Sequence, residues 1–324
     1  MAGGGGAVDA IVIGRNEGAR LVACLASLAG QVRRVVYVDS GSSDGSVAAA
    51  QAAGAIVIAL DLRQPFTAAR ARNAGLAALA KDPPGFVQFV DGDCTLAPGW
   101  IATALAQMAA QPQAGVVCGR RRELSPAASV YNRLADAEWN TPTGLALACG
   151  GDALMRHRAV VAVGGYRADL IAGEEPELCL RLRRAGWQVW RIDAEMTLHD
   201  AAMTRFAQWW RRAVRAGHAF AEGAALHGRG PERHWMAETR RAVTWGPGLA
   251  MASVVAPLIH PAGVLVLLVW PLQMARLARR WGGSRAAWER AVFSVLGKLP
   301  EGLGVFGYYL GRLTGRRRRL IEYK

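Results

Sequence analysis

Two aspartates separated by one glycine, Asp91-Gly92-Asp93, directly follow an apolar run at residues 86–90. Two carboxylates on a loop after a strand can present oxygen atoms to a hard divalent cation such as Mg²⁺ or Mn²⁺. A cation held in this way neutralises the charge of a diphosphate leaving group. The alternative for an isolated motif of this kind is a turn whose aspartates bond only to the nearby backbone.

A second acidic position supports the metal-binding interpretation. Asp39 follows an apolar run at residues 35–38 and opens the segment Ser40-Gly41-Ser42-Ser43-Asp44-Gly45. Small residues let backbone N–H groups come close to a ligand, and successive N–H groups can form an anion-binding concavity. The two acidic positions therefore predict a site for a phosphate-containing ligand.

The elements that position these residues alternate between strand and helix patterns. Strands are predicted at residues 10–13, 35–38, 56–60 and 86–90, and helices at residues 17–29, from Ser46, and at residues 67–79. This alternation is typical of parallel βαβ units, whose sheets bind ligands at the carboxyl ends of the strands. Further strands are predicted at residues 116–119, 145–149 and 189–192, and further helices at residues 158–163 and 175–185.

The order and spacing of these segments resemble the family 2 glycosyltransferases of the GT-A fold. The match covers about residues 8–200. It rests on the segments Ile-Val-Ile-Gly-Arg-Asn-Glu at 11–17, Val-Asp-Ser-Gly-Ser-Ser-Asp at 38–44, Ala-Arg-Asn-Ala-Gly at 71–75, Asp-Gly-Asp at 91–93, Cys-Gly-Gly-Asp-Ala-Leu-Met-Arg at 149–156, Val-Gly-Gly-Tyr at 163–166 and Gly-Glu-Glu-Pro-Glu-Leu at 173–178, leading into 181–186.

The resemblance implies a role for each matching residue. Asp91, Asp93 and His199 would form the metal site, although a lone histidine is also commonly structural. Arg72 would lie near the diphosphate. The residues that would bind the nucleotide-sugar are Gly14, Arg15, Asn16, Glu17, Asp39, Arg72, Asp91 and Gly151.

The catalytic base is implied at Glu175, with Glu174 beside it. The family motif is usually written Glu-Asp, whereas this chain has Glu174-Glu175, so either glutamate is a candidate. Such a carboxylate would take the proton from an acceptor hydroxyl as that oxygen attacks the anomeric carbon. Pro176 predicts a helix that begins here, and acidic residues in a first helical turn also have a capping role.

A further segment bears on whether the enzyme adds one sugar or many. Gln208-Trp209-Trp210-Arg211-Arg212 resembles the Q-x-x-R-W element of processive family members, but Arg212 stands where the final tryptophan would be. This departure favours transfer of a single sugar. The alternative is an amphipathic helix whose aromatic side chains pack against the rest of the protein.

Charge divides the chain of 324 residues into two parts. Residues 1–200 hold 19 basic and 19 acidic side chains, whereas residues 201–324 hold 20 basic and 6 acidic ones, which accounts for the whole net charge of +14. We therefore expect a catalytic domain at residues 1–200 and a basic, apolar, mostly helical region at residues 201–324. The hydrophobic fraction of 52% argues against disorder.

Five widely spaced cysteines, Cys24, Cys94, Cys118, Cys149 and Cys179, are an odd number without a C-x-x-C motif. They indicate reduced, mostly buried thiols in a cytosolic protein, with neither a disulfide framework nor a zinc site. Residues 1–7 lack a basic segment, and Asp9 interrupts the apolar stretch that follows, so we expect no secretory signal peptide.

The second part contains no formally charged residue over positions 242–275, which is long enough to cross a bilayer. Prolines at positions 247, 257, 261 and 271 argue against one straight span. A single span would also export Arg276 and the basic residues after it, against the positive-inside tendency. We predict a re-entrant segment or hairpin bent at residues 257–261, and a buried soluble hairpin is the alternative.

Basic and aromatic residues flank this run, as expected at an anionic membrane surface. They are Arg211, Arg212, Arg276, Arg279, Arg280, Arg316 to Arg319, Trp235, Trp245, Trp270, Trp281 and Trp288. The predicted location is the cytoplasmic face of the plasma (inner) membrane.

The predicted function is an inverting, metal-dependent glycosyltransferase. It would transfer one sugar, from a nucleotide-sugar that family resemblance suggests is a UDP-sugar, to a lipid-linked or membrane-presented acceptor in cell-surface polysaccharide or glycolipid synthesis. One alternative is a nucleotidyltransferase acting on sugar phosphates, which would release pyrophosphate. The other is a nucleic-acid-binding protein, but the cations here flank an apolar run, so we expect no nucleic-acid partner.

Overall fold

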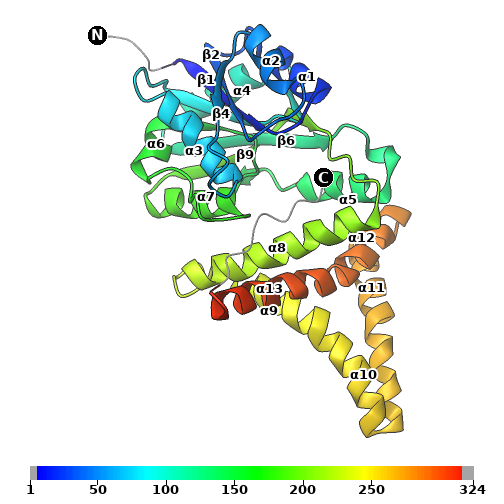
Figure 1. Ribbon diagram of the computed structural model, residues 1–324. Coiled ribbons are helices and arrows are strands. Elements are labelled where there is room, and N and C mark those ends of the chain that lie inside the picture. Colours follow the sequence, from blue (N-terminus) through cyan, green and yellow to red (C-terminus); the bar gives the residue numbers. More distant parts are fainter. Residues whose placement is uncertain (1–5, 316–324) are drawn as a thin grey trace. The chain divides into compact units, whose positions relative to one another are not determined.

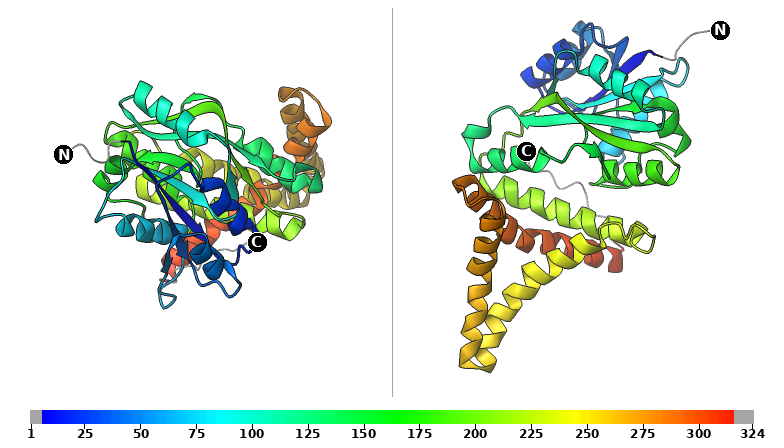
Figure 2. Two further views of the ribbon diagram at one scale, coloured as in Figure 1. Left: turned by 90° about the horizontal axis from the view of Figure 1, so that it is seen from above. Right: turned by 180° about the vertical axis from the view of Figure 1, so that it is seen from behind.

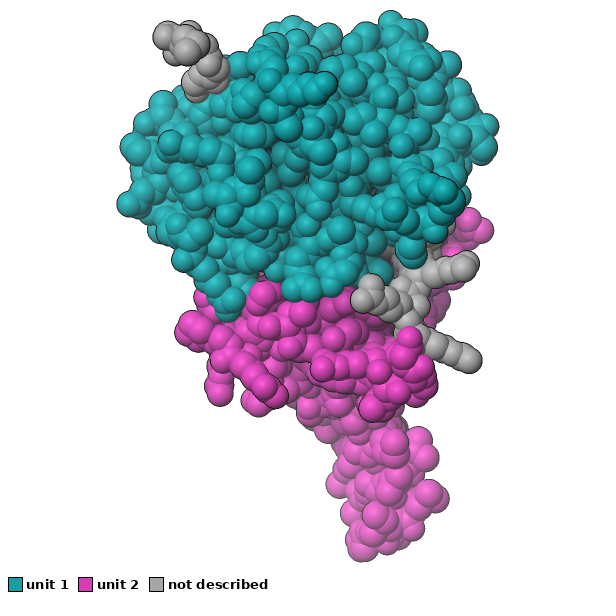
Figure 3. Space-filling view, turned by 60° about the vertical axis from the view of Figure 1, so that its left-hand side comes forward, with its two compact units in different colours: residues 1–128, 135–202 teal, residues 129–134, 203–324 magenta. Residues whose placement is uncertain are grey.

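The computed structural model describes residues 6–315 and divides them into two compact units (Figure 1). Unit 1 comprises residues up to 128 together with residues 135–202, and unit 2 comprises residues 129–134 and those from 203 onward (Figure 3). The boundary predicted from charge, between residues 200 and 201, lies beside this division. The basic run from Arg316 to Arg319 and the first five residues lie outside the described residues.

One sheet lies at the centre of unit 1, surrounded by helices (Figures 1 and 2). Its nine described strands run in the order β3-β2-β1-β4-β8-β6-β9-β5, and β7 pairs with β9 at the side. The strands are β1 (Val8–Gly14), β2 (Arg34–Asp39), β3 (Ile56–Ala59), β4 (Phe86–Asp91), β5 (Cys94–Leu96), β6 (Ala114–Glu123), β7 (Gly144–Leu145), β8 (Ala153–Arg156) and β9 (Gln188–His199).

The predicted parallel βαβ units form the first half of this sheet. Strand β1 pairs in parallel with both β2 and β4, and β2 pairs in parallel with β3. These strands are apolar because both of their faces are covered, and Ile11, Val36 and Phe89 are fully buried. Their carboxyl ends therefore lie side by side, with Gly14 beside Asp39 and Ile13 beside Asp91 in the register.

The second half of the sheet mixes directions. Strand β8 runs antiparallel to both β4 and β6, while β6 and β9 are parallel with register shifts. The strand predicted at residues 145–149 is wrong in extent, because only Gly144 and Leu145 pair with β9. The chain then leaves the sheet, and the Cys149 sulfur lies 3.6 Å from that of Cys179 on a helix.

Five helices of unit 1 begin close to their predicted positions: α1 (Ala19–Leu28), α2 (Ser46–Ala52), α3 (Ala68–Ala78), α6 (His157–Ala162) and α7 (Glu174–Arg184). Helix α4 (Trp100–Ala110) and a short 3₁₀ turn at Pro126–Ala128 were not predicted. Helix α5 (Val130–Trp139) is shared between the two units. Thr67 caps α3 by accepting a hydrogen bond from the Arg70 N–H, and all five cysteines are free and buried.

Unit 2 is helical throughout its described elements. These are α8 (Phe206–His227), α9 (Met236–Val243), a π-helical turn (Thr244–Gly248), α10 (Leu249–Ile259), a 3₁₀ segment (Pro261–Leu268), α11 (Val269–Arg280), α12 (Arg285–Leu296) and α13 (Lys298–Leu313). Helices α8 and α13 pack closely because Gly217 faces the backbone of Glu301, where an added Cβ would lie only 1.8 Å from the carbonyl oxygen. Gln208 begins α8 by accepting hydrogen bonds from the Thr204 and Arg205 N–H groups.

The apolar run of unit 2 forms a helical hairpin. Two stretches, Met236–Ile259 and Pro261–Arg280, are each long and apolar enough to cross a membrane, with mean hydropathy 1.5. Within unit 2, α10 and the 3₁₀ segment meet at one tip, and the two legs of the hairpin diverge from it toward their other ends (Figures 1 and 2). At the tip His260 is extended, and its Nδ1 accepts a hydrogen bond from the Ala262 N–H, which caps the second leg.

The bend of the hairpin lies within residues 257–261, but two of the prolines expected to interrupt the run lie inside helical segments. Pro247 lies in the π-helical turn and Pro257 inside α10, so the first leg continues through both. The direction changes only at His260 and Pro261. Close approach of the legs follows at Gly263, where an added Cβ would lie 2.2 Å from the Ala256 backbone, and Trp270 donates a hydrogen bond to Ser253 across them.

Candidate active site

A buried arginine gathers three carboxylates at the carboxyl ends of the central strands. The Arg72 guanidinium on α3 lies 2.9 Å from Asp91 Oδ1 at the end of β4, 3.0 Å from Glu174 Oε1 and 2.9 Å from Glu175 Oε1 at the start of α7. Its side chain is only 2% exposed, and its guanidinium carbon lies 5.4 Å from the centre of the Tyr166 ring. Residues far apart in the sequence are thus joined by one cation.

The two neighbouring glutamates differ in exposure. The Glu174 side chain is 4% exposed, whereas that of Glu175 is 16% exposed. Burial and the nearby Glu174 raise the pKa of Glu175 to about 7, although Arg72 acts in the opposite direction. Glu175 can therefore exchange a proton near neutral pH and is the more accessible of the pair.

A second arginine, Arg121 on β6, completes the surroundings of Asp91. It lies 2.9 Å from Asp91 Oδ2 and 3.2 Å from Asp152 Oδ2, and it stacks 5.1 Å from the Trp139 ring centre. Asp152 accepts hydrogen bonds from the Asp91 N–H and from the Thr197 hydroxyl. Arg72 and Arg121 hold the pKa of Asp91 below its usual value despite burial, so this carboxylate is ionised.

Gly151 fits against this cluster because it has no side chain. An added Cβ would lie 2.6 Å from Asp91 Oδ2 and 2.7 Å from the Arg72 Nη2. At the neighbouring Gly150 the nearest atom would be 3.7 Å away, which is an ordinary contact. The requirement for glycine is thus specific to position 151.

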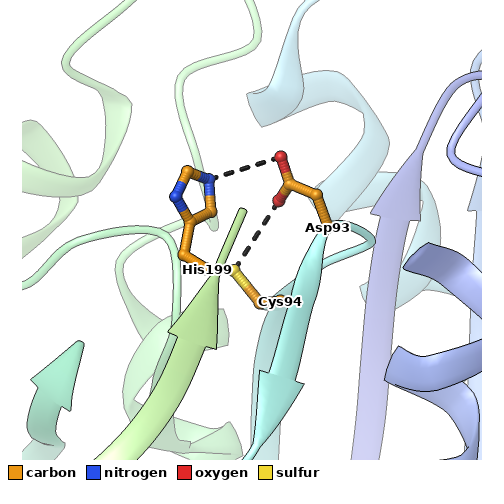
Figure 4. A group of neighbouring side chains, drawn as sticks. All are labelled: Asp93, Cys94 and His199. Carbon is orange, nitrogen blue, oxygen red and sulfur yellow. Dashed lines mark hydrogen bonds and ion pairs between the residues drawn. The ribbon is translucent and has the colours of Figure 1, made fainter. Parts of the chain in front are cut away.

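Asp93 and His199 form a second group, to which Cys94 belongs (Figure 4). His199 Nε2 lies 3.3 Å from Asp93 Oδ2, and the Cys94 sulfur lies 3.6 Å from Asp93 Oδ1. Burial and Arg121 lower the pKa of His199 to about 3, so the imidazole is neutral. Its T-shaped contact with Trp139, 4.8 Å between ring centres, fixes its plane.

The residues of this second group fit a divalent cation. A carboxylate oxygen and a neutral imidazole nitrogen are common ligands of such ions, and both are buried and directed at each other. Asp91 is less available as a metal ligand, because both of its carboxylate oxygens are paired with arginines. Asp93 and His199 are therefore the residues that would hold the ion.

The predicted nucleotide-binding loops also come together. Asn16, in a left-handed conformation with φ of 56°, accepts a hydrogen bond from the Ser43 N–H and donates its own N–H to Ser42. Asp39 is buried and accepts from the Gly41 and Ser42 N–H groups. Glu17 pairs with Arg20, while Arg15 is exposed.

Gly92 connects this loop pair to the acidic turn. Its N–H donates to the Ile13 carbonyl, and an added Cβ would lie 3.2 Å from the Glu17 side chain and 3.5 Å from Gly14. The residues predicted for the site thus lie at adjoining strand ends, in the loop before β8 (Gly151), on α3 (Arg72) and at the start of α7. Their roles toward a ligand stay predictions.

Sequence reasoning did not identify Arg121, Asp152 or Trp139 as parts of the site. Arg121 belongs to the run Arg120-Arg121-Arg122 on an interior strand. Cations are unusual in such a strand, so this run was the signal that could have identified Arg121. Asp152 lies in one of the segments that carry the family resemblance, but that resemblance assigned it no role. Trp139 carried no signal, since only packing brings it to His199 and Arg121.

Comparison with known proteins shows that the first half of the chain is similar to glycosyltransferases. Residues 9–159 match the family model described as glycosyl transferase family 2. The pre-mycofactocin glycosyltransferase of Mycobacterium tuberculosis strain H37Rv is 28% identical over 233 residues, which cover 68% of this chain and 48% of that protein. The chain spans about half the length of this curated relative.

Solved structures share the fold. A mannosyltransferase from Pyrobaculum calidifontis, in complex with GDP-Man and Mn²⁺, matches with a TM-score of 0.59 and 22% identity over 89% of this chain and 86% of that chain. The S. aureus TarS fragment 1–349, in complex with UDP-GlcNAc, matches with a TM-score of 0.53 and 13% identity over 97% and 93% of the two chains. At these identities the likeness establishes the fold alone.

Proposed function

The chain belongs to glycosyl transferase family 2 and has the GT-A fold, and from its site we propose an inverting enzyme that transfers one sugar from a nucleotide-sugar. The observation that carries the proposal is the Arg72 cluster, in which one cation positions Asp91 and the Glu174-Glu175 pair. A base, an ionised carboxylate and adjoining glycine-rich loops then lie at one sheet edge, as transfer to a hydroxyl group requires.

Glu175 is the proposed catalytic base. Its carboxylate takes the proton of the acceptor hydroxyl as the hydroxyl oxygen forms a bond to the anomeric carbon. The bond between that carbon and the diphosphate oxygen breaks, and the nucleoside diphosphate leaves with the electron pair. A pKa of about 7 suits this role, because about half of the carboxylates are ionised at neutral pH and the ionised form is basic enough to accept the proton.

Arg72 and Glu174 are proposed positioning residues. Arg72 is buried and touches both glutamates, so it fixes the Glu175 side chain and prevents mutual repulsion from displacing it. Glu174 is almost inaccessible and raises the basicity of its neighbour.

Asp93 and His199 are the proposed holders of Mg²⁺ or Mn²⁺. Such an ion would stabilise the negative charge of the diphosphate leaving group. The loops at Gly14 to Glu17 and at Asp39 are proposed to bind the nucleoside of the donor, for which UDP is the preferred candidate. Gly151 leaves room for the Asp91 carboxylate beside them.

The acceptor is proposed to be lipid-linked or presented at a membrane, in cell-surface polysaccharide or glycolipid synthesis. Support comes from the hairpin of unit 2, whose two apolar stretches are only 11% and 6% buried. Arg240 and Arg241 precede the uncharged run, and Arg276, Arg279 and Arg280 follow it. Both cationic ends of a hairpin would face the same side, which the positive-inside tendency makes the cytoplasmic one.

A nucleotide-binding assay tests the proposal. We expect UDP or another nucleoside diphosphate to raise the melting temperature of the wild type in the presence of Mn²⁺, and less so for Asp93→Ala. Activity on a nucleotide-sugar should release nucleoside diphosphate. Release of pyrophosphate would instead identify a nucleotidyltransferase, and absence of stabilisation by every nucleotide would overturn the proposed function.

A further inference from the structure

A groove of about 500 Å³ in unit 2 has walls that are almost entirely apolar. Four elements form it: α8, the π-helical turn, α10 and α13. The side chains that define its walls are those of Trp210, Pro247, Met251, Val254, Leu299 and Leu303.

The chemistry of these walls selects the kind of ligand. Among the described residues that line the groove, none is charged and none offers a carboxylate, amide or hydroxyl group. A sugar, phosphate or nucleobase would lose its hydrogen bonds to water there without replacement. A hydrocarbon chain has no such cost and gains from leaving water.

The groove is continuous with the exposed apolar hairpin. Met251 and Val254 line the groove and are each 66% exposed, and they lie on α10, the same helix that carries Leu258 and Ile259 at the tip. A bilayer that accepts the hairpin would also meet the groove. A chain could then pass from the bilayer into the groove without crossing water.

Cationic residues lie next to the groove in the chain. Arg211, which is exposed, directly follows Trp210 on α8, and Arg240 and Arg241 on α9 come shortly before Pro247. An apolar cleft whose lining residues are close in the sequence to cations suits a lipid whose headgroup carries phosphate.

We propose that this groove binds part of the hydrocarbon chain of the phosphate-linked lipid that carries the acceptor. The inference rests on the proposed function, because it supplies the lipid part of that acceptor. A bulk phospholipid needs no recess to surround the hairpin, whereas an enzyme that modifies one lipid-linked glycan must hold that lipid during transfer.

Photocrosslinking tests the assignment. The full chain is placed in nanodiscs of phosphatidylcholine and phosphatidylglycerol with a long polyprenyl phosphate that carries a diazirine in its chain. Crosslinked residues are identified by mass spectrometry. We expect labels on the groove walls, including Met251 and Leu303, and competition by unlabelled polyprenyl phosphate.

A matched pair of variants on α10 locates the site. Ala250→Trp fills the groove with a large side chain and should lower the crosslinking yield by about tenfold. Leu258→Trp introduces the same residue on the same helix outside the groove and should retain the wild-type yield. Leu303→Trp, on the opposite wall, replaces Ala250→Trp if that variant has a lowered melting temperature.

Equal yields in the wild type and the groove variants would overturn the assignment. Competition by added phosphatidylglycerol as strong as that by polyprenyl phosphate would identify a bulk-lipid site and would also overturn it. Failure of the proposed function would be seen in a different experiment, the melting-temperature assay with nucleoside diphosphates, because the residues proposed to bind the nucleotide belong to unit 1. Both groove variants should retain that stabilisation.

Discussion

The two units place charge and apolar surface in opposite ways. In unit 1, Arg72 and Asp152 are buried, Arg121 and Asp91 are partly buried, and all four are paired within one cluster. In unit 2, large apolar side chains such as Leu258 and Ile259 are about four-fifths exposed, and cations lie on either side of them in the sequence. Buried charge is costly unless it is paired, and exposed apolar surface marks an interaction site. This contrast underlies our proposals that unit 1 carries the chemistry and that unit 2 associates with a membrane.

The largest effect is expected from Glu175→Gln, which removes the proposed base while retaining its shape. We expect kcat to fall by about a hundredfold to ten-thousandfold with little change in donor affinity. Steady-state kinetics and nucleotide titration measure the two quantities. The exposed Asp169→Asn provides a control with unchanged kcat, and a larger loss of kcat in Glu174→Gln than in Glu175→Gln would reverse the assignment of the base.

Arg72→Met tests whether the charges of unit 1 depend on one another. The substitution leaves Asp91, Glu174 and Glu175 without their shared cation, and we expect a loss of about 3–5 kcal/mol in the free energy of unfolding. Urea denaturation measures this value. Arg63→Met, which removes an exposed arginine paired with Asp61, should cost no more than about 1 kcal/mol. Similar costs for both variants would contradict the importance of the cluster.

Leu258→Asp adds a charge to the exposed apolar hairpin of unit 2, whereas Arg72→Met removes a buried charge from unit 1. A charge at the hairpin tip should oppose bilayer insertion by about 2.5–3.5 kcal/mol. The free energy of unfolding in solution should change by no more than about 0.5 kcal/mol, because the side chain is 81% exposed. Vesicle sedimentation checks the first expectation. Leu62→Asp, at an exposed leucine of unit 1, should leave sedimentation unchanged.

Gly151→Ala tests the packing of the site at the scale of one methyl group. The new Cβ would press on Asp91 and Arg72, so we expect a loss of about 1–3 kcal/mol in stability together with weaker donor binding. Gly150→Ala should be tolerated because its Cβ meets only an ordinary contact. Denaturation and nucleotide titration measure stability and donor affinity for both variants. Equal losses in Gly151→Ala and Gly150→Ala would contradict a specific need for glycine at position 151.

The last prediction concerns pH. With the pKa of Glu175 near 7, the fraction of ionised base falls below that value, so kcat/KM should drop by about tenfold per pH unit on the acidic side. A raised pKa also means that ionisation disfavours the folded state, so the wild type should lose stability as pH rises from the ordinary glutamate range through 7. Melting curves of Glu175→Gln should lack this loss. A wild-type activity profile flat between pH 5 and 7 would contradict the prediction.

Much of unit 1 could be predicted because its strands have a local signal. Continuous apolar runs that end in polar loops defined β1, β2 and β4, and parallel pairing places their carboxyl ends at one edge. The contacts of Arg72 could not be predicted in the same way. Its partners Glu174 and Glu175 are about a hundred residues away, and only the packing of α3 and α7 joins them.

The sequence by itself determined the order of acidic strand ends, the separation of net charge into the second part, and the length of its uncharged run. These are local patterns whose physical meaning does not depend on distant residues. The tertiary structure alone decided that Arg121 and Trp139 belong to the site, that Glu175 is more accessible than Glu174, and that His260 turns the hairpin while Pro247 and Pro257 stay within helices. These outcomes depend on burial and on contacts between segments, which no local pattern encodes.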